Sequence, residues 1–371
     1  MDGTTYGTAE QTIEFPVERS QQPVGVDERE AIVADPGFGK HFTDHMARAV
    51  WTSDRGWHDS AIVPRAPLVL DPATAVLHYA QEIFEGLKAY RHADGSVWTF
   101  RPDANALRMQ RSSRRTALPE LPVPAFLDSI DRLVQTDIEW VPSGGETSLY
   151  LRPFMFASEA FLGVRPAMHV TYLVIASPAG SYFSGGLKPV NIWLTEEYTR
   201  AAPGGLGAAK TGPNYAASLL PQQEAIANGC DQVCFLDAVE HRWVEELGGM
   251  NLYFVYDDGS IVTPELTGTI LEGVTRDAVL TLAGDHGHKV EERRVSIDEW
   301  RDGVRSGRVT EVFACGTAAV ITPLGRLQWR DGEVASASGG TGPVTQKLRD
   351  ALVGIQYGTA PDEHGWLHRV C

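Results

Sequence analysis

Cysteine is scarce in this sequence, and the few cysteines present do not form the pattern of a cross-linked or metal-bound protein. The 371 residues contain four, Cys230, Cys234, Cys315 and Cys371, and no two of them are spaced as C-x-x-C. Cys230 and Cys234 also lack a nearby cluster of histidines that could complete a zinc site. We therefore expect reduced cysteines, no disulfide framework and no metal site.

Long apolar runs and a leader segment are lacking as well. No uninterrupted apolar stretch reaches the length needed to span a bilayer. Residues 1–30 have neither the basic region nor the apolar region of a secretory signal, and their polar composition predicts a poorly ordered lead-in. The cytoplasm is therefore the expected location.

Positive charge is the third deficit. Lysine and arginine total 32 against 48 acidic residues, which gives a net charge of −16. Such an excess of negative charge disfavours nucleic acid or an anionic membrane as the partner. It leaves room for a local basic pocket that holds one small anion, so we expect small-molecule ligands.

The length and the order of the expected elements indicate two domains of mixed structure. A chain of 371 residues is too long for one comfortable core. The segment 177–189, SPAGSYFSGGLKP, is rich in small and turn-forming residues, which predicts a connection between domains at 31–176 and 190–371. Strands and helices alternate without a regular βαβ rhythm, which favours an α+β fold.

The expected elements follow from apolar periodicity and from turn residues. Strands are predicted at 77–80, 97–101, 148–157, 169–176, 190–195, 232–237, 251–256, 290–295 and 310–314, and helices at 103–118, 126–140, 215–228, 275–284, 297–305 and 344–357.

A lone lysine, Lys210, lies in the small and irregular stretch GGLGAAKTGPNYAASLL. Lysines mostly occupy solvated surfaces, so a lysine on a surface loop is one interpretation. The other is a nucleophilic amine, because close packing lowers the pKa of a lysine and frees its lone pair.

Two adjacent glutamates, Glu245 and Glu246, lie in the apolar segment WVEELGGMNLYFVY. On a regular strand they point to opposite faces, so only one of them can point inward, where a cationic partner would be needed. The alternative is an edge strand that carries two solvated acids.

Two further segments offer groups that could bind an anion. In LEGVTRDAVLTLA, Gly273 precedes a helix whose first turn presents free N–H groups and the positive end of the helix dipole. In FACGTAAVITP, a strand ends in small residues that let backbone amides and one hydroxyl approach a ligand. Taken singly, an ordinary helix start and an ordinary strand end explain them equally well.

Together and in this order, the four segments resemble fold-type IV pyridoxal-phosphate enzymes and, among them, the branched-chain amino acid aminotransferases. The resemblance extends from about residue 51 to 357 and includes the blocks HYAQEIFEGLKAYR, RMQRSSRRTALP, SLYLRPFMF, LGVRP, KTGPNYAASL, EELGGMN, GVTRDAV and CGTAAVITP. It implies a smaller N-terminal α/β domain, a larger C-terminal pseudo-barrel domain and pyridoxal 5′-phosphate as cofactor.

The resemblance also implies a role for each cofactor-binding residue. Lys210 would form the Schiff base and then move the proton. Glu246, rather than Glu245, would bind the pyridine nitrogen, and Tyr215 would bind the phenolic oxygen. The phosphate would be held by Arg111, by the N–H groups of Val274 and Thr275 and by the Thr317 hydroxyl, with Arg200 close to the cofactor.

For the substrate, the resemblance implies an apolar and aromatic pocket that also accepts a second carboxylate. Arg152 is the residue expected to bind that carboxylate, and Leu162 and Val164 are expected to reach the pocket of a neighbouring subunit in a homodimer. The remaining pocket residues would be Tyr79, Phe84, Tyr150 and Tyr182, with the amides of Thr317 and Ala318 at the α-carboxylate.

The implied activity is transfer of the amino group of L-leucine, L-isoleucine or L-valine to 2-oxoglutarate. A transaminase for another hydrophobic L-amino acid, or a D-amino acid aminotransferase, is the alternative. The sequence departs from the family at Pro213, which replaces a glycine, and at Ala319 and Thr322, which replace the redox C-x-x-C of some members. No thiol switch of that kind is expected.

Overall fold

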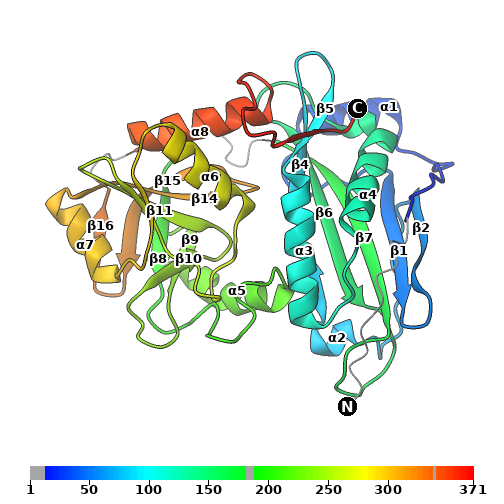
Figure 1. Ribbon diagram of the computed structural model, residues 1–371, viewed down its shortest axis with the longest axis horizontal. Helices are drawn as coiled ribbons and strands as arrows, with labels where there is room; N and C mark the ends of the chain where they lie inside the picture. Colours follow the sequence, from blue (N-terminus) through cyan, green and yellow to red (C-terminus); the bar gives the residue numbers. More distant parts are fainter. Residues whose placement is uncertain (1–12, 181–187, 337–339) are drawn as a thin grey trace.

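Two β-sheets organise the protein, as a computed structural model shows (Figure 1). The structure describes residues 13–180, 188–336 and 340–371. The first sheet belongs mainly to the first half of the chain and the second sheet to the second half. Helices α3 and α5 lie where the two halves meet (Figure 1). The expected α+β fold is confirmed.

The first sheet is antiparallel and has the order β17-β5-β4-β6-β7-β1-β2, with β3 paired to β6. Its long central strands bury residues on both faces, because helix α4 covers one face and a second apolar cluster covers the other. The strands are β1 (His45–Thr52), β2 (Gly56–Pro64), β3 (Glu82–Phe84), β4 (Leu87–Arg91), β5 (Val97–Phe100), β6 (Ser148–Ala157), β7 (His169–Ala179) and β17 (Leu367–Arg369).

Two amphipathic helices, α3 (Pro102–Thr116) and α4 (Val123–Thr136), pack against each other and against this sheet. The apolar positions of α4 recur at helical spacing and bury Phe126, Ile130 and Leu133. On α3 the inward face instead carries polar groups, among them Asn105, Arg108 and Ser112. Buried polar side chains need partners, and these find theirs at the boundary between the two halves.

The second sheet has the order β10-β9-β8-β15-β14-β11-β12-β13, with β16 paired to β15. It mixes antiparallel pairs with three parallel ones, β8–β9, β8–β15 and β12–β13. Its strands are β8 (Val190–Leu194), β9 (Gln232–Leu236), β10 (Val244–Leu247), β11 (Asn251–Tyr256), β12 (Ile261–Thr263), β13 (Val290–Glu292), β14 (Val309–Gly316), β15 (Val320–Trp329) and β16 (Gly332–Ala335).

Four helices surround the second sheet: α5 (Gly212–Ala227), α6 (Val274–Asp285), α7 (Ile297–Ser306) and α8 (Pro343–Gln356). Helix α5 contacts β8 and β9 and also β3 of the first sheet, so it joins the two halves. Helix α8 lies on β14 and β15 and also contacts β5 (Figure 1).

Strand β17 returns the chain to the first sheet. Leu367, His368 and Arg369 pair with Phe100, Thr99 and Trp98 of β5. The His368 ring lies 2.8 Å from the Asp131 carboxylate on α4, and the hydrogen bond to Asp131 raises the pKa of His368. The edge of the first sheet is thus completed by residues that follow the second sheet in the sequence.

The predicted strands at 148–157 and 251–256 coincide with β6 and β11, and every predicted helix is present with shifted ends. The strand predicted at 77–80 is wrong, because residues 76–79 form the short helix α2 (Val76–Tyr79). Four residues are too few for apolar periodicity to separate a strand from a helical turn.

The poorly ordered lead-in expected at 1–30 is wrong for residues 13–30. Phe15 is buried in the first core and its N–H donates to Asp128 at 2.9 Å, while α1 (Val26–Ala34) begins inside the segment. The predicted connection at 177–189 lies partly outside the described residues, since it includes 181–187. No helix in the described part of the chain is long and apolar enough to cross a membrane.

Candidate active site

Lys210 lies between the Gly/Ala-rich stretch and helix α5, and groups from the first half of the chain hold its backbone. Its N–H donates to the Ser112 hydroxyl at 3.0 Å, and its carbonyl accepts from the Phe84 N–H at 3.0 Å. The carbonyls of the preceding stretch are held by the Asn214 amide, which donates to Leu206 and Ala209. Lys210 is thus fixed from both halves of the protein.

The Lys210 amine points at the first turn of α5. Its Nζ donates to the Tyr215 hydroxyl at 2.8 Å and lies 4.8 Å from the centre of the Phe84 ring. The Phe84 and Tyr215 rings are themselves 4.9 Å apart. A half-buried amine between two aromatic faces differs from a lysine on a solvated loop, so the surface interpretation of Lys210 is wrong.

The position of Pro213 at the start of a helix explains why proline is tolerated there. It lies in the first turn of α5, directly after Gly212, where the helix has no intrahelical use for the missing N–H. Proline at this place begins a helix without cost to hydrogen bonding, and the departure from the family pattern leaves the geometry of Lys210 intact.

Glu246 is buried on β10 in an ion pair with Arg200. Its Oε1 lies 2.8 Å from Arg200 Nη1 and accepts the Leu271 N–H at 2.8 Å, and the Asn251 amide approaches its other oxygen at 3.4 Å. Burial raises the pKa of Glu246, and the neighbouring charges of Arg200 and Lys210 only partly offset that effect. Arg200 Nε has no hydrogen-bond partner among the described residues, so the pair has unused capacity for a ligand.

Glu245 is buried as well, contrary to the strand-alternation argument. The register of β10 against β9 slips between Val244 and Leu247, which places an extra residue on β10. Such a bulge breaks the alternation of side chains. Glu245 accepts a hydrogen bond from the Thr269 hydroxyl, and burial raises its pKa. Two solvated acids are therefore excluded.

Three of the predicted phosphate residues, Arg111, Val274 and Thr275, lie around the start of α6. Arg111 Nη2 is 3.0 Å from the Glu272 carboxylate, one residue before the N-cap Gly273. Helix α6 has no side-chain cap in the part of the chain that the structure describes, so its first-turn N–H groups at Val274 and Thr275 are available. A half-exposed cation and open helix N–H groups at one place suit a small anion.

Thr317 and Ala318 form the turn between β14 and β15. Lys88 of β4 donates to the Ala318 carbonyl at 2.9 Å and thereby ties this turn to the first sheet. Burial lowers the pKa of Lys88 to about 8. Sequence reasoning missed Lys88, because its partner lies 230 residues away.

Phe84, Tyr150 and Arg152 form one cluster beside Lys210. Arg152 donates to the Tyr150 hydroxyl at 3.0 Å and lies over the Phe84 ring at 4.7 Å. The Tyr150 hydroxyl would be 2.3 Å from a Cβ at position 86, so Gly86 is required for its approach. An aromatic wall with one guanidinium can accommodate an apolar side chain and a carboxylate.

The other predicted pocket residues lie apart from this cluster. The Tyr79 hydroxyl donates to the Leu162 carbonyl at 2.5 Å, and Tyr79, Leu162 and Val164 are all exposed. Tyr182 lies outside the described residues.

Sequence reasoning also missed a buried polar network at the base of the site. Arg108 makes two hydrogen bonds to Glu85, at 2.8 and 2.7 Å, and donates to the Glu272 carbonyl.

Glu82 was missed as well. It lies two residues before Phe84 and accepts the Gly212 N–H, and burial raises the pKa of Glu82. The one available signal was spacing, since Glu82 and Phe84 share a face of a strand.

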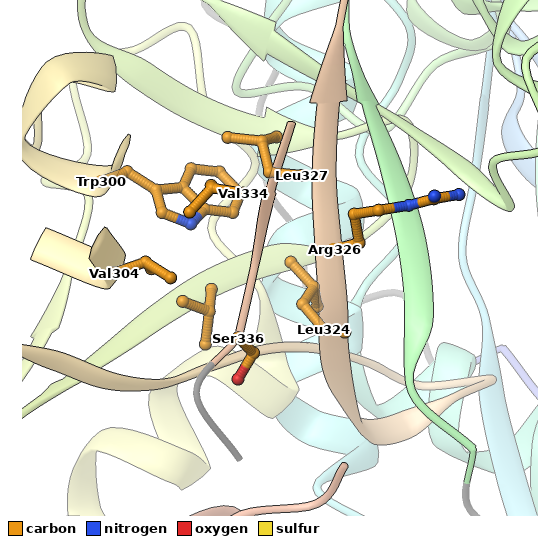
Figure 2. A pocket seen from close by; sticks show the side chains of 9 residues that line it. Trp300, Val304, Leu324, Arg326, Leu327, Val334 and Ser336 are labelled. Atoms are coloured by element: carbon orange, nitrogen blue, oxygen red, sulfur yellow. The ribbon is translucent and has the colours of Figure 1, made fainter. Parts of the chain in front are cut away.

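A small cavity elsewhere is unrelated to this site. Figure 2 shows it among Trp300, Val304, Leu324 and Val334 in the core of the second half. Its volume of about 10 Å³ has room for one water at most, and none of the predicted site residues lines it.

Comparison with known proteins identifies the family. Residues 82–327 match the amino-transferase class IV family. The chain belongs to the class IV aminotransferase family. Lys210, Glu246, Arg111 and Thr317 all lie within the matched segment.

Among curated class IV relatives, a probable branched-chain-amino-acid aminotransferase of Streptomyces coelicolor is 63% identical over 94% of this chain and 96% of its own length. The branched-chain-amino-acid aminotransferase of Mycolicibacterium smegmatis is 56% identical over 96% of this chain and 98% of its own. A solved branched-chain amino acid aminotransferase from T.th., with pyridoxamine 5′-phosphate, superposes with a TM-score of 0.73 at 29% identity. That match covers 88% of this chain and 99% of the other.

Proposed function

We propose that this class IV aminotransferase transfers the amino group of L-leucine, L-isoleucine and L-valine to 2-oxoglutarate, with pyridoxal 5′-phosphate bound at Lys210. One observation carries the proposal: the Lys210 amine donates a hydrogen bond to the Tyr215 hydroxyl. It does so in a chain that is 56 to 63% identical to relatives named as branched-chain-amino-acid aminotransferases. The products would be branched 2-oxo acids and L-glutamate.

The residues present fit the cofactor. Lys210 supplies the amine that bonds to it, Tyr215 a partner for the phenolic oxygen, and Glu246 a carboxylate for the pyridine nitrogen. Arg200 has a buried Nε without a partner in the described ranges, which leaves it able to support Glu246 and the cofactor together. Arg111, the Thr317 hydroxyl and the N–H groups of Val274 and Thr275 would hold the phosphate.

When bound, pyridoxal phosphate supplies a carbonyl carbon that takes up the amino group and a ring that accepts electrons from Cα. The protein supplies the proton transfers and the orientation. The Lys210 amine, once free, is the base that moves the Cα proton, and Tyr215 orients it through the 2.8 Å hydrogen bond. Glu246 would face the pyridine nitrogen as a carboxylate and keep it protonated, because a carboxylate buried as deeply as this one needs a cationic partner.

The substrate side of the proposal rests on the Phe84, Tyr150 and Arg152 cluster. Burial of an aliphatic side chain against this wall contributes about 1.5–3 kcal/mol. The Arg152 guanidinium, whose Nε has no partner among the described residues, would bind the second carboxylate of glutamate or 2-oxoglutarate. The Thr317 and Ala318 amides would meet the α-carboxylate.

We also propose a homodimer, with a domain boundary in each chain at residues 177–189. Leu162 is 66% and Val164 is 92% exposed, and the adjacent Tyr79 holds their loop through the Leu162 carbonyl. Exposed apolar side chains on a fixed loop suit contact with a second copy, where Leu162 and Val164 would reach the partner's pocket. The cytoplasmic location stays a prediction.

A panel of amino donors with 2-oxoglutarate, followed as glutamate formed, tests the activity. We expect L-leucine, L-isoleucine and L-valine to be the best donors, and we expect Lys210→Ala to abolish both turnover and the visible absorbance of the covalently bound cofactor. Transfer from D-alanine but not from L-leucine, or an unchanged visible band in Lys210→Ala, would overturn the proposal.

A further inference from the structure

Strand β3 and the start of α5 are joined by three hydrogen bonds, although about 130 residues separate them. The Phe84 N–H donates to the Lys210 carbonyl at 3.0 Å, and the Thr211 hydroxyl donates to the Glu82 carbonyl at 2.6 Å. The third bond is made by the Glu82 side chain, whose Oε1 accepts the Gly212 N–H. The two segments thus hold each other at Lys210 and at the two residues that follow it.

The third bond replaces a missing helix cap. Thr211 occupies the N-cap position of α5, where a threonine hydroxyl normally accepts an N–H of the first turn. Here that hydroxyl donates to Glu82 instead, and α5 has no cap from its own N-cap side chain. Glu82 supplies the acceptor from another strand, at the positive end of the helix dipole.

The residue at position 212 leaves room for this cap. A Cβ built on Gly212 would lie 2.3 Å from Glu82 Oε1, so a larger residue there would push the carboxylate away. The approach is therefore specific to the pair of Glu82 and Gly212.

The capped turn carries the reacting groups. Lys210 precedes Gly212 by two residues, and Tyr215 follows it by three, in the first turn of α5. The Phe84 ring, on the same strand face as Glu82, contacts both of them. A shift of this turn would therefore change the 2.8 Å contact between the Lys210 amine and the Tyr215 hydroxyl.

We propose that Glu82 is a positioning residue, which caps α5 from outside the helix and thereby keeps the Lys210 amine on the Tyr215 hydroxyl. It acts as a hydrogen-bond acceptor at the start of the helix. The inference rests on the proposed function, because it concerns the lysine assigned there.

The test compares Glu82→Ala and Glu82→Gln with wild type. Cofactor-free protein is mixed with pyridoxal phosphate, and the rate at which the visible band appears is recorded. In a second measurement, kcat and KM for L-leucine are determined with the holoenzyme. We expect Glu82→Ala to slow band formation and to lower kcat about tenfold, with KM within about twofold of wild type, because the shifted turn misplaces the Lys210 amine.

Glu82→Gln keeps an acceptor oxygen and should restore at least half of the wild-type rate. Glu120→Ala, which removes a surface partner of Arg114, is the matched control and should match wild type. Cooperative thermal unfolding of every variant, with a midpoint above the assay temperature, establishes that the variants are folded.

Two outcomes would overturn the inference: Glu82→Ala behaving like Glu120→Ala, or Glu82→Gln performing no better than Glu82→Ala. Failure of the proposed function is distinguishable, because band formation needs no amino donor. If wild type forms the band but does not use L-leucine, only the substrate assignment fails.

Discussion

In the part of the chain that the structure describes, each half buries one arginine–glutamate pair, and the two pairs are held very differently. In the first half, Arg108 binds both oxygens of Glu85, and the Asn105 amide donates to the same carboxylate at 2.8 Å. In the second half, Arg200 reaches only one oxygen of Glu246. Both glutamates are almost completely buried.

The pKa values of the two glutamates shift in opposite directions. Burial opposes the ionisation of Glu85, but the charge and hydrogen bonds of Arg108 outweigh it, so the pKa of Glu85 is lowered. For Glu246 burial prevails over Arg200, and the pKa is raised. The Arg108–Glu85 pair, whose polar groups have partners, stabilises the fold. The Arg200–Glu246 pair, in which Arg200 Nε has no partner among the described residues, can bind a ligand.

Removing the arginine of each pair should separate these roles most strongly. Arg108→Met leaves Glu85 charged and buried without its main partner, which we expect to lower the free energy of unfolding by about 3–5 kcal/mol. Arg200→Met should cost less, about 1–3 kcal/mol, because Glu246 can take up a proton and keeps the Leu271 N–H. Urea denaturation at neutral pH measures both, and equal losses would contradict the comparison.

Replacing the two glutamates should distinguish the two pairs by how the stability of the protein depends on pH. Because the folded-state pKa of Glu85 is lowered, its stabilisation is present above the unfolded pKa of about 4.3 and is lost as the pH falls through the folded pKa. Because the pKa of Glu246 is raised, the folded protein loses stability as the pH rises from the unfolded pKa through the folded pKa.

We therefore expect Glu85→Gln to destabilise the cofactor-free protein at neutral pH and Glu246→Gln to stabilise it, while both differences shrink near pH 4. Glu246→Gln should still lower turnover at least 100-fold, because the proposed charge at the pyridine nitrogen is lost. Unfolding curves at several pH values, together with kcat, decide this. A destabilised Glu246→Gln at neutral pH would count against a raised pKa.

The smallest effect on stability is expected from a substitution beside the Arg200–Glu246 pair. Thr269→Val removes the hydroxyl that donates to Glu245, whose other oxygen already lacks a partner among the described residues. We expect a loss of about 1 kcal/mol. Thr281→Val on the exposed face of α6 is the matched control and should change stability by less than about 0.5 kcal/mol. Thermal unfolding of the two variants in parallel would reveal whether Glu245 depends on Thr269.

The fold could be predicted well where strands and helices have clear periodicity and turns. Strands β6 and β11 were predictable to the residue because each is a largely apolar segment that is bounded by recognisable turn residues. Strands β1 and β2 were not predicted. Met46 and Ala47 are both buried, since both faces of this part of the sheet are covered, and alternation is then lost.

Some residues of the candidate site were likewise predictable from the sequence, and others were not. Lys210, Tyr215 and Glu246 were predictable because they occur in compact sequence blocks. Ser112 and Glu82 were not, because their partners lie 98 and 130 residues away and only the folded chain brings them together. The bulge in β10 that buries Glu245 is likewise a property of strand pairing and not of the local sequence.

Strand β17 has a consequence for the order of assembly during synthesis. The edge strand β5 receives its outer partner from residues 367–369, nearly 270 positions later. During synthesis the first half of the chain emerges from the ribosome while β5 still lacks this partner strand. The edge of β5 stays unpaired until the second half has emerged. Stalled or truncated products ending before residue 367 would therefore expose an unpaired strand, and they should associate through it more readily than the finished chain.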